Sequence, residues 1–446
     1  MSGAHQGSAD IPGTLLADVH DTYLQWLGDD YDLGALNVVL CAAAAEKLSG
    51  DPPWLLVVGG SGAAKTESVA PLAGAGGHII STINGEAALL SGTPAKSRAK
   101  NATGGLLRKI GPSGVLVIKD FTSILSMNRD TRAHVLAALR EIYDGHWSRN
   151  VGTDGGFTLT WRGRIVVIGA VTTAWDSAYQ VVSTMGDRFA LVRLRTGDHR
   201  RAAGLQAMGN VGDETAMREQ LAAVTGKLLA GAQAYVSAEP EPGLTDQEMG
   251  SLLGLADLVT RARTPVQRDY QGNPAFAHGL EMPTRFAKQL VQIARGGLLL
   301  GLDRGTAMRV AARCCQDTMP PLRRVVLADV AGHPGSFTPD VADRVQIPKT
   351  TVDRTLQELQ LLGLLEVEHI VYGQNQRLRW MYRLAPGIDA ADLAKCTRNV
   401  SSPPETPLCP AREPRASWPS TTPWPWATCT AARWSRAGPR WSSSPT

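Results

Sequence analysis

The 446-residue sequence lacks the features that mark several large classes of protein. No stretch approaches the roughly 18 uninterrupted apolar residues that a membrane-spanning helix needs. The opening residues, MSGAHQGSADIPG, do not run from basic to apolar as a secretory signal peptide does. We therefore expect a cytoplasmic protein with no membrane partner.

Cysteine patterns and excess charge are also missing. The six cysteines form no CxxC pair and no zinc-ligand spacing with histidine, so we interpret them as ordinary thiols. The formal net charge is +4, but residues 401–446 hold five arginines against two glutamates, which leaves only +1 for residues 1–400. Any contact with nucleic acid must come from a local basic patch.

Residues 401–446 also lack the apolar side chains that build a core. They contain five of the chain's 11 Trp and 10 of its 27 Pro, and Leu408 is the only aliphatic residue larger than Ala. This segment is either a Pro-rich partner-binding tail or a frameshifted end, and we favour the second interpretation. Arg, Pro, Ser, Trp and Ala are what a wrong frame of GC-rich DNA encodes, and neither origin gives a packed structure.

What the sequence does contain is a glycine-rich loop between a buried strand and a helix. A helix is expected at residues 33–48, and the apolar run Trp54–Val58 is typical of a strand covered on both faces. GGSGAAKT and another helical stretch follow directly. Such a loop cradles phosphates with its backbone N–H groups, while the lysine reaches the β- and γ-phosphates and the threonine hydroxyl holds Mg²⁺. The predicted ATP-binding residues are Gly59, Gly60, Ser61, Gly62, Ala63, Ala64, Lys65 and Thr66.

Two more buried strands end at polar residues. Residues 115–118 lead to Lys119 and Asp120, and residues 164–168 lead to Thr172 and Thr173. Strands that alternate with helices predict a parallel sheet with its active residues at the carboxyl ends of the strands. Asp120 is then a candidate for Mg²⁺ or the attacking water, and Thr172 or Thr173 for sensing the γ-phosphate. The alternative is that these residues only cap turns.

The order of these parts resembles the AAA+ ATPases, and among them the helix-insert branch that holds the minichromosome-maintenance helicases. GGSGAAKT at residues 59–66 looks like that group's phosphate loop, in which Ala also precedes Lys. GVLVIKDF at residues 114–121 looks like its Walker B strand, and STMGDRF at residues 183–189 resembles its arginine-finger turn. MPTRFAKQL at residues 282–290 resembles its sensor 2 helix, so the likeness covers roughly residues 33–300.

The resemblance implies ATP and Mg²⁺ as ligands and a homo-oligomer, either a ring or a partial ring. Arg188 takes the place of the arginine finger that acts on a neighbouring subunit, and Arg285 that of sensor 2. Lys119 stands where the family has its metal-binding Asp, so Asp120 falls on the catalytic Glu position. Either Asp120 acts as base while Thr66 and phosphates hold Mg²⁺, or it holds Mg²⁺ itself and hydrolysis is slow. Residues 1–32 do not resemble that family's N-terminal DNA-binding domain, so we do not expect a replicative helicase.

The next part of the chain predicts helices at residues 214–236, 245–262, 282–299 and 304–315, as in a helical lid. Within it, residues 261–278 mix basic and aromatic side chains. This mixture suits contact with nucleic acid, but a solvated loop is the commoner cause, and we favour the loop.

A third unit begins near Ser336 and has the pattern of a winged helix-turn-helix. Helices are expected at residues 337–345 and 349–359, followed by paired strands at residues 364–369 and 378–384. The predicted core is Val341, Val345, Ile347, Val352, Leu356, Leu359 and Leu362. The predicted DNA contacts are Lys349, Thr350, Thr351 and Arg354 on the second helix, with Arg377 in the wing. The alternative for such a module is a protein-binding role.

The sequence thus predicts an α/β P-loop NTPase of the AAA+ type with a helical lid and a C-terminal winged helix. The expected division is an N-terminal extension (1–32), ATPase core (33–199), lid (200–330), winged helix-turn-helix (331–386) and a disordered or aberrant tail (387–446). The expected function is an ATPase acting on DNA, helicase-like or DNA-remodelling, from a bacterial mobile or phage-like element. The alternative is a nucleotide-switched transcriptional regulator with little or no ATP turnover.

Overall fold

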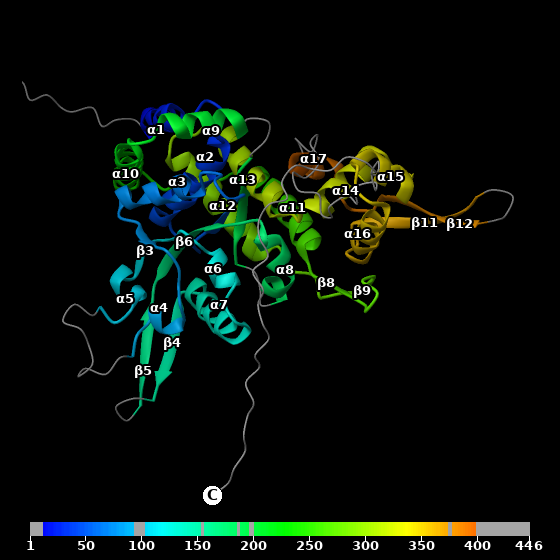
Figure 1. The fold of residues 1–446 in the computed structure, drawn as a ribbon, viewed down its shortest axis with the longest axis horizontal. Coiled ribbons are helices and arrows are strands. Elements are labelled where there is room, and N and C mark those ends of the chain that lie inside the picture. Colours follow the sequence, from blue (N-terminus) through cyan, green and yellow to red (C-terminus); the bar gives the residue numbers. More distant parts are fainter. Residues whose placement is uncertain are drawn as a thin grey trace, which may run out of the picture. The chain divides into compact units, whose positions relative to one another are not determined.

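A five-stranded parallel sheet forms the centre of the N-terminal half of the chain (Figure 1). The computed structural model describes residues 12–92, 103–152, 156–184, 188–195, 200–372 and 377–397. The strand order is β2-β3-β6-β1-β7, and every neighbouring pair is parallel, so the predicted α/β architecture is confirmed. The strands are β1 (Trp54–Val58), β2 (His78–Ile80), β3 (Ser113–Ile118), β6 (Arg164–Val171) and β7 (Ala190–Arg193).

Alternate residues of the interior strand β1 enter two separate hydrophobic cores. Leu55 and Val57 belong to one core, which they share with helix α2 (Leu33–Ala44). Trp54, Leu56 and Val58 belong to the other, which they share with helix α7 (Arg129–Tyr143). Because both faces of β1 are covered, its sequence is apolar at every position rather than alternating.

Shorter elements connect the strands of this sheet. A two-stranded antiparallel hairpin is inserted between α7 and β6, and the inward residues Trp147, Leu159 and Trp161 pack on the second core. The remaining elements here are α3 (Lys65–Val69), η2 (Ala70–Ala75), α4 (Glu86–Leu89), α5 (Leu106–Ile110), α6 (Thr122–Leu125), β4 (His146–Val151), β5 (Phe157–Arg162) and α8 (Ala174–Thr184).

The helical region after the sheet matches its prediction closely. It consists of α9 (Arg200–Gly209), α10 (Glu214–Ala238), α11 (Asp246–Arg263), α12 (Thr284–Leu299) and α13 (Arg304–Thr318). The part expected to be a loop contains a small antiparallel hairpin, β8 (Val266–Arg268) and β9 (Pro274–Ala277). Helix α1 (Pro12–Leu27), in the expected N-terminal extension, packs against α10 through buried side chains such as Leu16 and Val19.

The C-terminal module contains three helices and a three-stranded antiparallel sheet with the order β10-β12-β11. Of its seven predicted core residues, all are buried except Val345, which is half-buried. Figure 1 shows β11 and β12 as a long ribbon of two neighbouring arrows. The elements are α14 (Pro321–Gly332), β10 (Ser336–Phe337), α15 (Thr338–Val345), α16 (Lys349–Leu361), β11 (Leu365–Tyr372) and β12 (Arg377–Leu384).

One boundary differs from the prediction. Residues 387–446 were expected to be disordered or aberrant throughout, but helix α17 (Ala390–Thr397) lies within them. It contacts α11, α13 and α14, and Leu393 is 1% exposed. The unpatterned tail therefore begins after this helix, and residues 398–446 lie outside the described part of the chain. Among the described residues, no helix is both long and apolar enough to cross a membrane.

Candidate functional site

The glycine-rich loop, residues 59–66, leaves the carboxyl end of β1 and runs into helix α3. Gly62 and Ala64 have positive φ angles of 75° and 53°, which turn the chain sharply. The Lys65 ammonium donates a hydrogen bond to the carbonyl oxygen of Gly59 at 2.9 Å and another to that of Gly60. A Cβ added at Gly60 or Gly62 would meet nothing within 4 Å, so the outer side of the loop is open to a ligand.

Ala64 holds a left-handed backbone conformation that an L-residue adopts only at a cost of roughly 1–2 kcal/mol. Ala64→Gly should therefore raise the free energy of unfolding by about 1 kcal/mol, measured by urea denaturation. The matched control is Ala63→Gly, because Ala63 is not among the positive-φ residues and glycine there only adds freedom to the unfolded chain. Equal shifts in the two variants would contradict the strain at Ala64.

Electrostatics link the loop to Asp120. Partial burial lowers the pKa of Lys65, and the negative charges of Asp120 and Glu67 oppose that shift. Asp120 therefore lies near enough for its charge to act on the Lys65 ammonium. The structure brings together these two residues, which are 55 positions apart in the sequence.

Asp120 follows β3 at the same edge of the sheet. Its backbone N–H donates to the Ser81 carbonyl oxygen at 2.9 Å, and its carboxylate oxygen Oδ1 accepts the backbone N–H of Ser123 at 3.3 Å. Both Asp120 and Lys119 are exposed. One oxygen of the Asp120 carboxylate is thus fixed by a hydrogen bond, and the side chain is accessible to solvent. A carboxylate that binds Mg²⁺ or a water molecule needs this access.

Thr172 lies between the loop and Asp120, because β6 separates β1 from β3 in the sheet. The hydroxyl of Thr122 accepts the backbone N–H of Thr172 at 3.0 Å and donates to the Thr172 hydroxyl at 3.3 Å. The sequence analysis did not identify Thr122 as a site residue. Its position two residues after Asp120, beyond the end of the same strand, could have indicated it. Thr173, the alternative to Thr172, is exposed.

Arg188 and Arg285 lie at the opposite, amino edge of the sheet. The Arg188 guanidinium is 3.5 Å from the Asp144 carboxylate and lies over the Tyr143 ring, 5.6 Å from its centroid. Burial lowers the pKa of Arg285, and the positive charge of Arg188 lowers it further, so the two arginines are neighbours. Tyr143 packs on Trp54, the first residue of β1, at 5.3 Å between ring centroids.

The predicted catalytic residues therefore form two groups. Leu194 directly follows β7 and donates its backbone N–H to the carbonyl oxygen of Val58, beside the loop. Arg188 lies six residues before Leu194 in the sequence. An extended strand rises about 3.3 Å per residue, so roughly 20 Å separates Arg188 from the loop of its own chain. Lys65, Asp120 and Thr172 share one edge, and Arg188 and Arg285 share the other.

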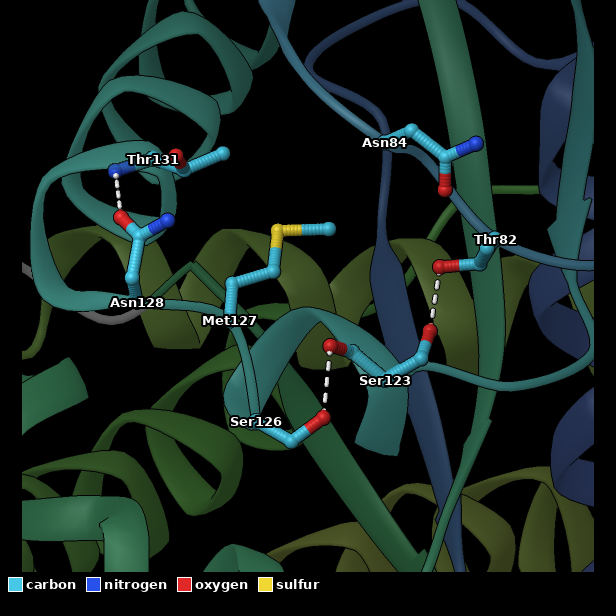
Figure 2. A pocket seen from close by; sticks show the side chains of 7 residues that line it. All are labelled: Thr82, Asn84, Ser123, Ser126, Met127, Asn128 and Thr131. Atoms are coloured by element: carbon cyan, nitrogen blue, oxygen red, sulfur yellow. Dashed lines mark hydrogen bonds between the residues drawn. The ribbon is translucent and has the colours of Figure 1, made fainter. Parts of the chain in front are cut away.

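A pocket of about 410 Å³ is lined by residues that follow β2 and by residues from α6 to the start of α7 (Figure 2). Figure 2 shows the hydrogen bonds that join Thr82 to Ser123 and Asn128 to Thr131, with the Met127 side chain between them. The lining residues are Thr82, Asn84, Ser123, Ser126, Met127, Asn128 and Thr131. None is ionisable, so this pocket does not supply the charge that a triphosphate needs.

The predicted DNA-contact residues of the C-terminal module lie in different surroundings. Lys349 and Thr350 are exposed at the start of α16, and Thr351 is half-buried. Arg354 is also half-buried, and its Nη2 donates to the Gln271 carbonyl oxygen at 2.8 Å, so the side of the helix that was predicted to be open is partly covered at this residue. Arg377 begins β12, but its side chain lies outside the described part of the structure.

No family model matches this sequence, and no curated protein matches it significantly. The geometry of these residues therefore carries the functional proposal.

Proposed function

We propose that this protein is a P-loop ATPase of the AAA+ type that acts on DNA. One observation carries the proposal: the glycine-rich loop, Thr172 and Asp120 follow three adjacent strands, β1, β6 and β3, at one edge of a parallel sheet. Ligands of open α/β sheets bind at this edge. A loop with an open outer side, a lysine and a nearby carboxylate is suited to a nucleotide triphosphate.

Each residue at this edge has a role in the proposal. Lys65, which now bonds to the loop carbonyls, would bind the β- and γ-phosphates, and the exposed Thr66 hydroxyl would hold Mg²⁺ with the help of Asp120. The metal would neutralise phosphate charge when bound. Thr172, fixed by Thr122, lies where a hydroxyl contacts the γ-phosphate or orients water.

The C-terminal module supports the DNA part of the proposal. The order α15-α16-β11-β12 corresponds to the two helices and paired strands predicted for a winged helix-turn-helix, with α16 as the second helix of the motif. Helix α14 and strand β10, which were not predicted, precede them. Lys349 and Thr350 present basic and hydroxyl groups that suit phosphate oxygens and base edges. Helices α9 to α13, within residues 200–330, would form the lid.

The alternative is a nucleotide-switched regulator with little or no ATP turnover. Lys119 favours the regulator, because the AAA+ family that the sequence resembles has two acidic residues after this strand. Here an exposed lysine replaces the first of them, beside Asp120. The Arg188 and Arg285 pair favours an active, oligomeric ATPase. ATP turnover measured with and without DNA, beside the rate of nucleotide exchange, separates the two functions.

Asp120→Asn should leave ATP affinity within about twofold and reduce turnover at least about 100-fold, because the amide cannot accept a proton from water and binds a metal poorly. Radioactive phosphate release and equilibrium binding of a fluorescent ATP analogue measure the two effects. Asp130→Asn is the matched control, since Asp130 is an exposed acid in the first turn of α7. Full turnover in Asp120→Asn would exclude the proposed role of this carboxylate.

A further inference from the structure

The β8–β9 hairpin lies against α16, the helix that carries the predicted DNA contacts. Arg268 on the hairpin forms an ion pair with Glu358 on the helix. Arg354 donates to the Gln271 carbonyl oxygen at 2.8 Å. A Cβ at Gly272 would lie 3.3 Å from the Arg354 guanidinium, so the hairpin turn rests directly on this side chain.

Buried ionic contacts fix the base of the hairpin as well. Glu358 is 5% exposed and also accepts the Nε–H of Arg323 at 2.9 Å. Arg323 in turn donates to the carbonyl oxygens of Ala262 at 2.8 Å and Thr264 at 2.7 Å, just before β8. The Glu358 carboxylate therefore binds both Arg268 on the hairpin strand and Arg323 on α14. These contacts hold the hairpin against α16.

The contacts also set the direction of the hairpin along the helix. Arg268 meets Glu358, whereas Gln271 meets Arg354, which is four residues or about 6 Å closer to the start of α16. The hairpin tip, residues 268–273, therefore points toward the first turn of α16. That turn carries the exposed Lys349 and Thr350.

The chemistry of the tip suits a polyanion that offers hydrogen-bond acceptors. The Tyr270 side chain is 95% exposed. The one acid of the tip, Asp269, accepts the backbone N–H groups of Asn273 and Gln271, each at 2.8 Å, and these bonds lower its pKa. Its carboxylate is thus engaged by the turn. The Asn273 amide donates to Asp269 and Gln271 within the tip, and the Gln271 amide donates to the Tyr270 hydroxyl oxygen at 3.1 Å, which leaves the phenol O–H able to donate to a ligand. Tyrosine and amide side chains are common donors to the DNA backbone.

We propose that the hairpin tip is a second element that contacts duplex DNA, beside the start of α16, and that Arg354 positions it instead of contacting a base. The inference rests on the proposed DNA-binding function and adds residues from the helical region to the DNA-binding surface. The basic and aromatic segment 261–278, for which the sequence favoured a solvated loop, is then part of this surface.

A double-mutant cycle on the full chain tests the proposal. Fluorescence anisotropy with a labelled duplex at low salt should show about tenfold weaker binding for Tyr270→Ala and a similar loss for Arg354→Ala. The double variant should be no weaker than the worse single variant, because both changes remove the same contact. Lys349→Ala should weaken binding independently, so its effect should multiply with that of Tyr270→Ala. Arg354→Lys should retain most affinity, since lysine can still donate to the Gln271 carbonyl.

Tyr235→Ala is the matched control, because Tyr235 is an exposed tyrosine on α10. Wild-type protein that does not bind duplex at low salt would overturn both the DNA-binding function and this inference. Binding that Lys349→Ala weakens and Tyr270→Ala leaves unchanged would overturn the hairpin alone. Losses that multiply between Tyr270→Ala and Arg354→Ala would show that Arg354 contacts DNA itself, and would overturn its positioning role.

Discussion

Lys65→Ala should weaken ATP binding by about 100-fold or more. The ammonium is the one cation that the glycine-rich loop itself offers to phosphate oxygens. Hydrogen bonds to charged groups are worth about 1.5–3 kcal/mol each, so loss of the phosphate contacts amounts to roughly 3 kcal/mol, or about 100-fold in affinity. Isothermal titration with a slowly hydrolysed ATP analogue and Mg²⁺ measures the loss directly.

The matched control is Lys227→Ala, an exposed lysine on α10. It should bind ATP like the wild type. Lys65 also bonds to the carbonyl oxygens of Gly59 and Gly60, so the thermal midpoint of Lys65→Ala must be compared with that of the wild type. A folded Lys65→Ala variant with unchanged ATP affinity would exclude a phosphate-binding role for the loop.

The parts of the fold that could be predicted are those with a strong local signal. The continuous apolar run of β1 is such a signal, and so are the helical periods of α10 to α13, because each arises from residues that are close together in the sequence. The structure has these elements within a few residues of their predicted bounds. The alternation of Phe157, Leu159 and Trp161 was an equally local signal for the hairpin that we did not predict. The three-residue edge strand β2 is too short to give any such signal.

The relative positions of the candidate residues depend on contacts between distant segments, which a single sequence does not encode in its periodicity. The resemblance named Lys65, Asp120, Arg188 and Arg285 together. The parallel pairing of the strands and the contacts of the two arginines near the start of β1 divide these residues between opposite edges of the sheet. The contact between Arg354 and Gln271 spans 83 residues and covers a side chain that helical periodicity placed on the open face. Helix α17 was missed because eight residues beside an unpatterned tail carry little information.

Arg188→Ala should reduce ATP turnover by about 1,000-fold or more and leave ATP affinity almost unchanged. An arginine that meets the transferred phosphoryl group stabilises charge that develops only in the transition state, an effect of about 10³–10⁵ in rate. Coupled-enzyme assays give the rate, and titration with the ATP analogue gives the affinity. Arg162→Ala, an exposed arginine at the end of β5, is the control.

The geometry further predicts that this loss can be complemented. Arg188 and its own loop lie at opposite edges of the sheet, about 20 Å apart by strand length, so the proposed finger role requires Arg188 to act on ATP held by a second subunit. Arg188→Ala subunits keep an intact loop but no finger, and Lys65→Ala subunits keep the finger but no loop. When the two inactive variants are mixed, an interface can pair an intact loop with an intact Arg188, and turnover should return to a substantial fraction of the wild-type value. Two Lys65→Ala preparations mixed with each other provide the baseline. Two results would contradict catalysis between subunits. One is a protein that stays monomeric in the presence of ATP and hydrolyses it at the full rate. The other is a mixture whose subunits exchange but whose turnover stays at the baseline.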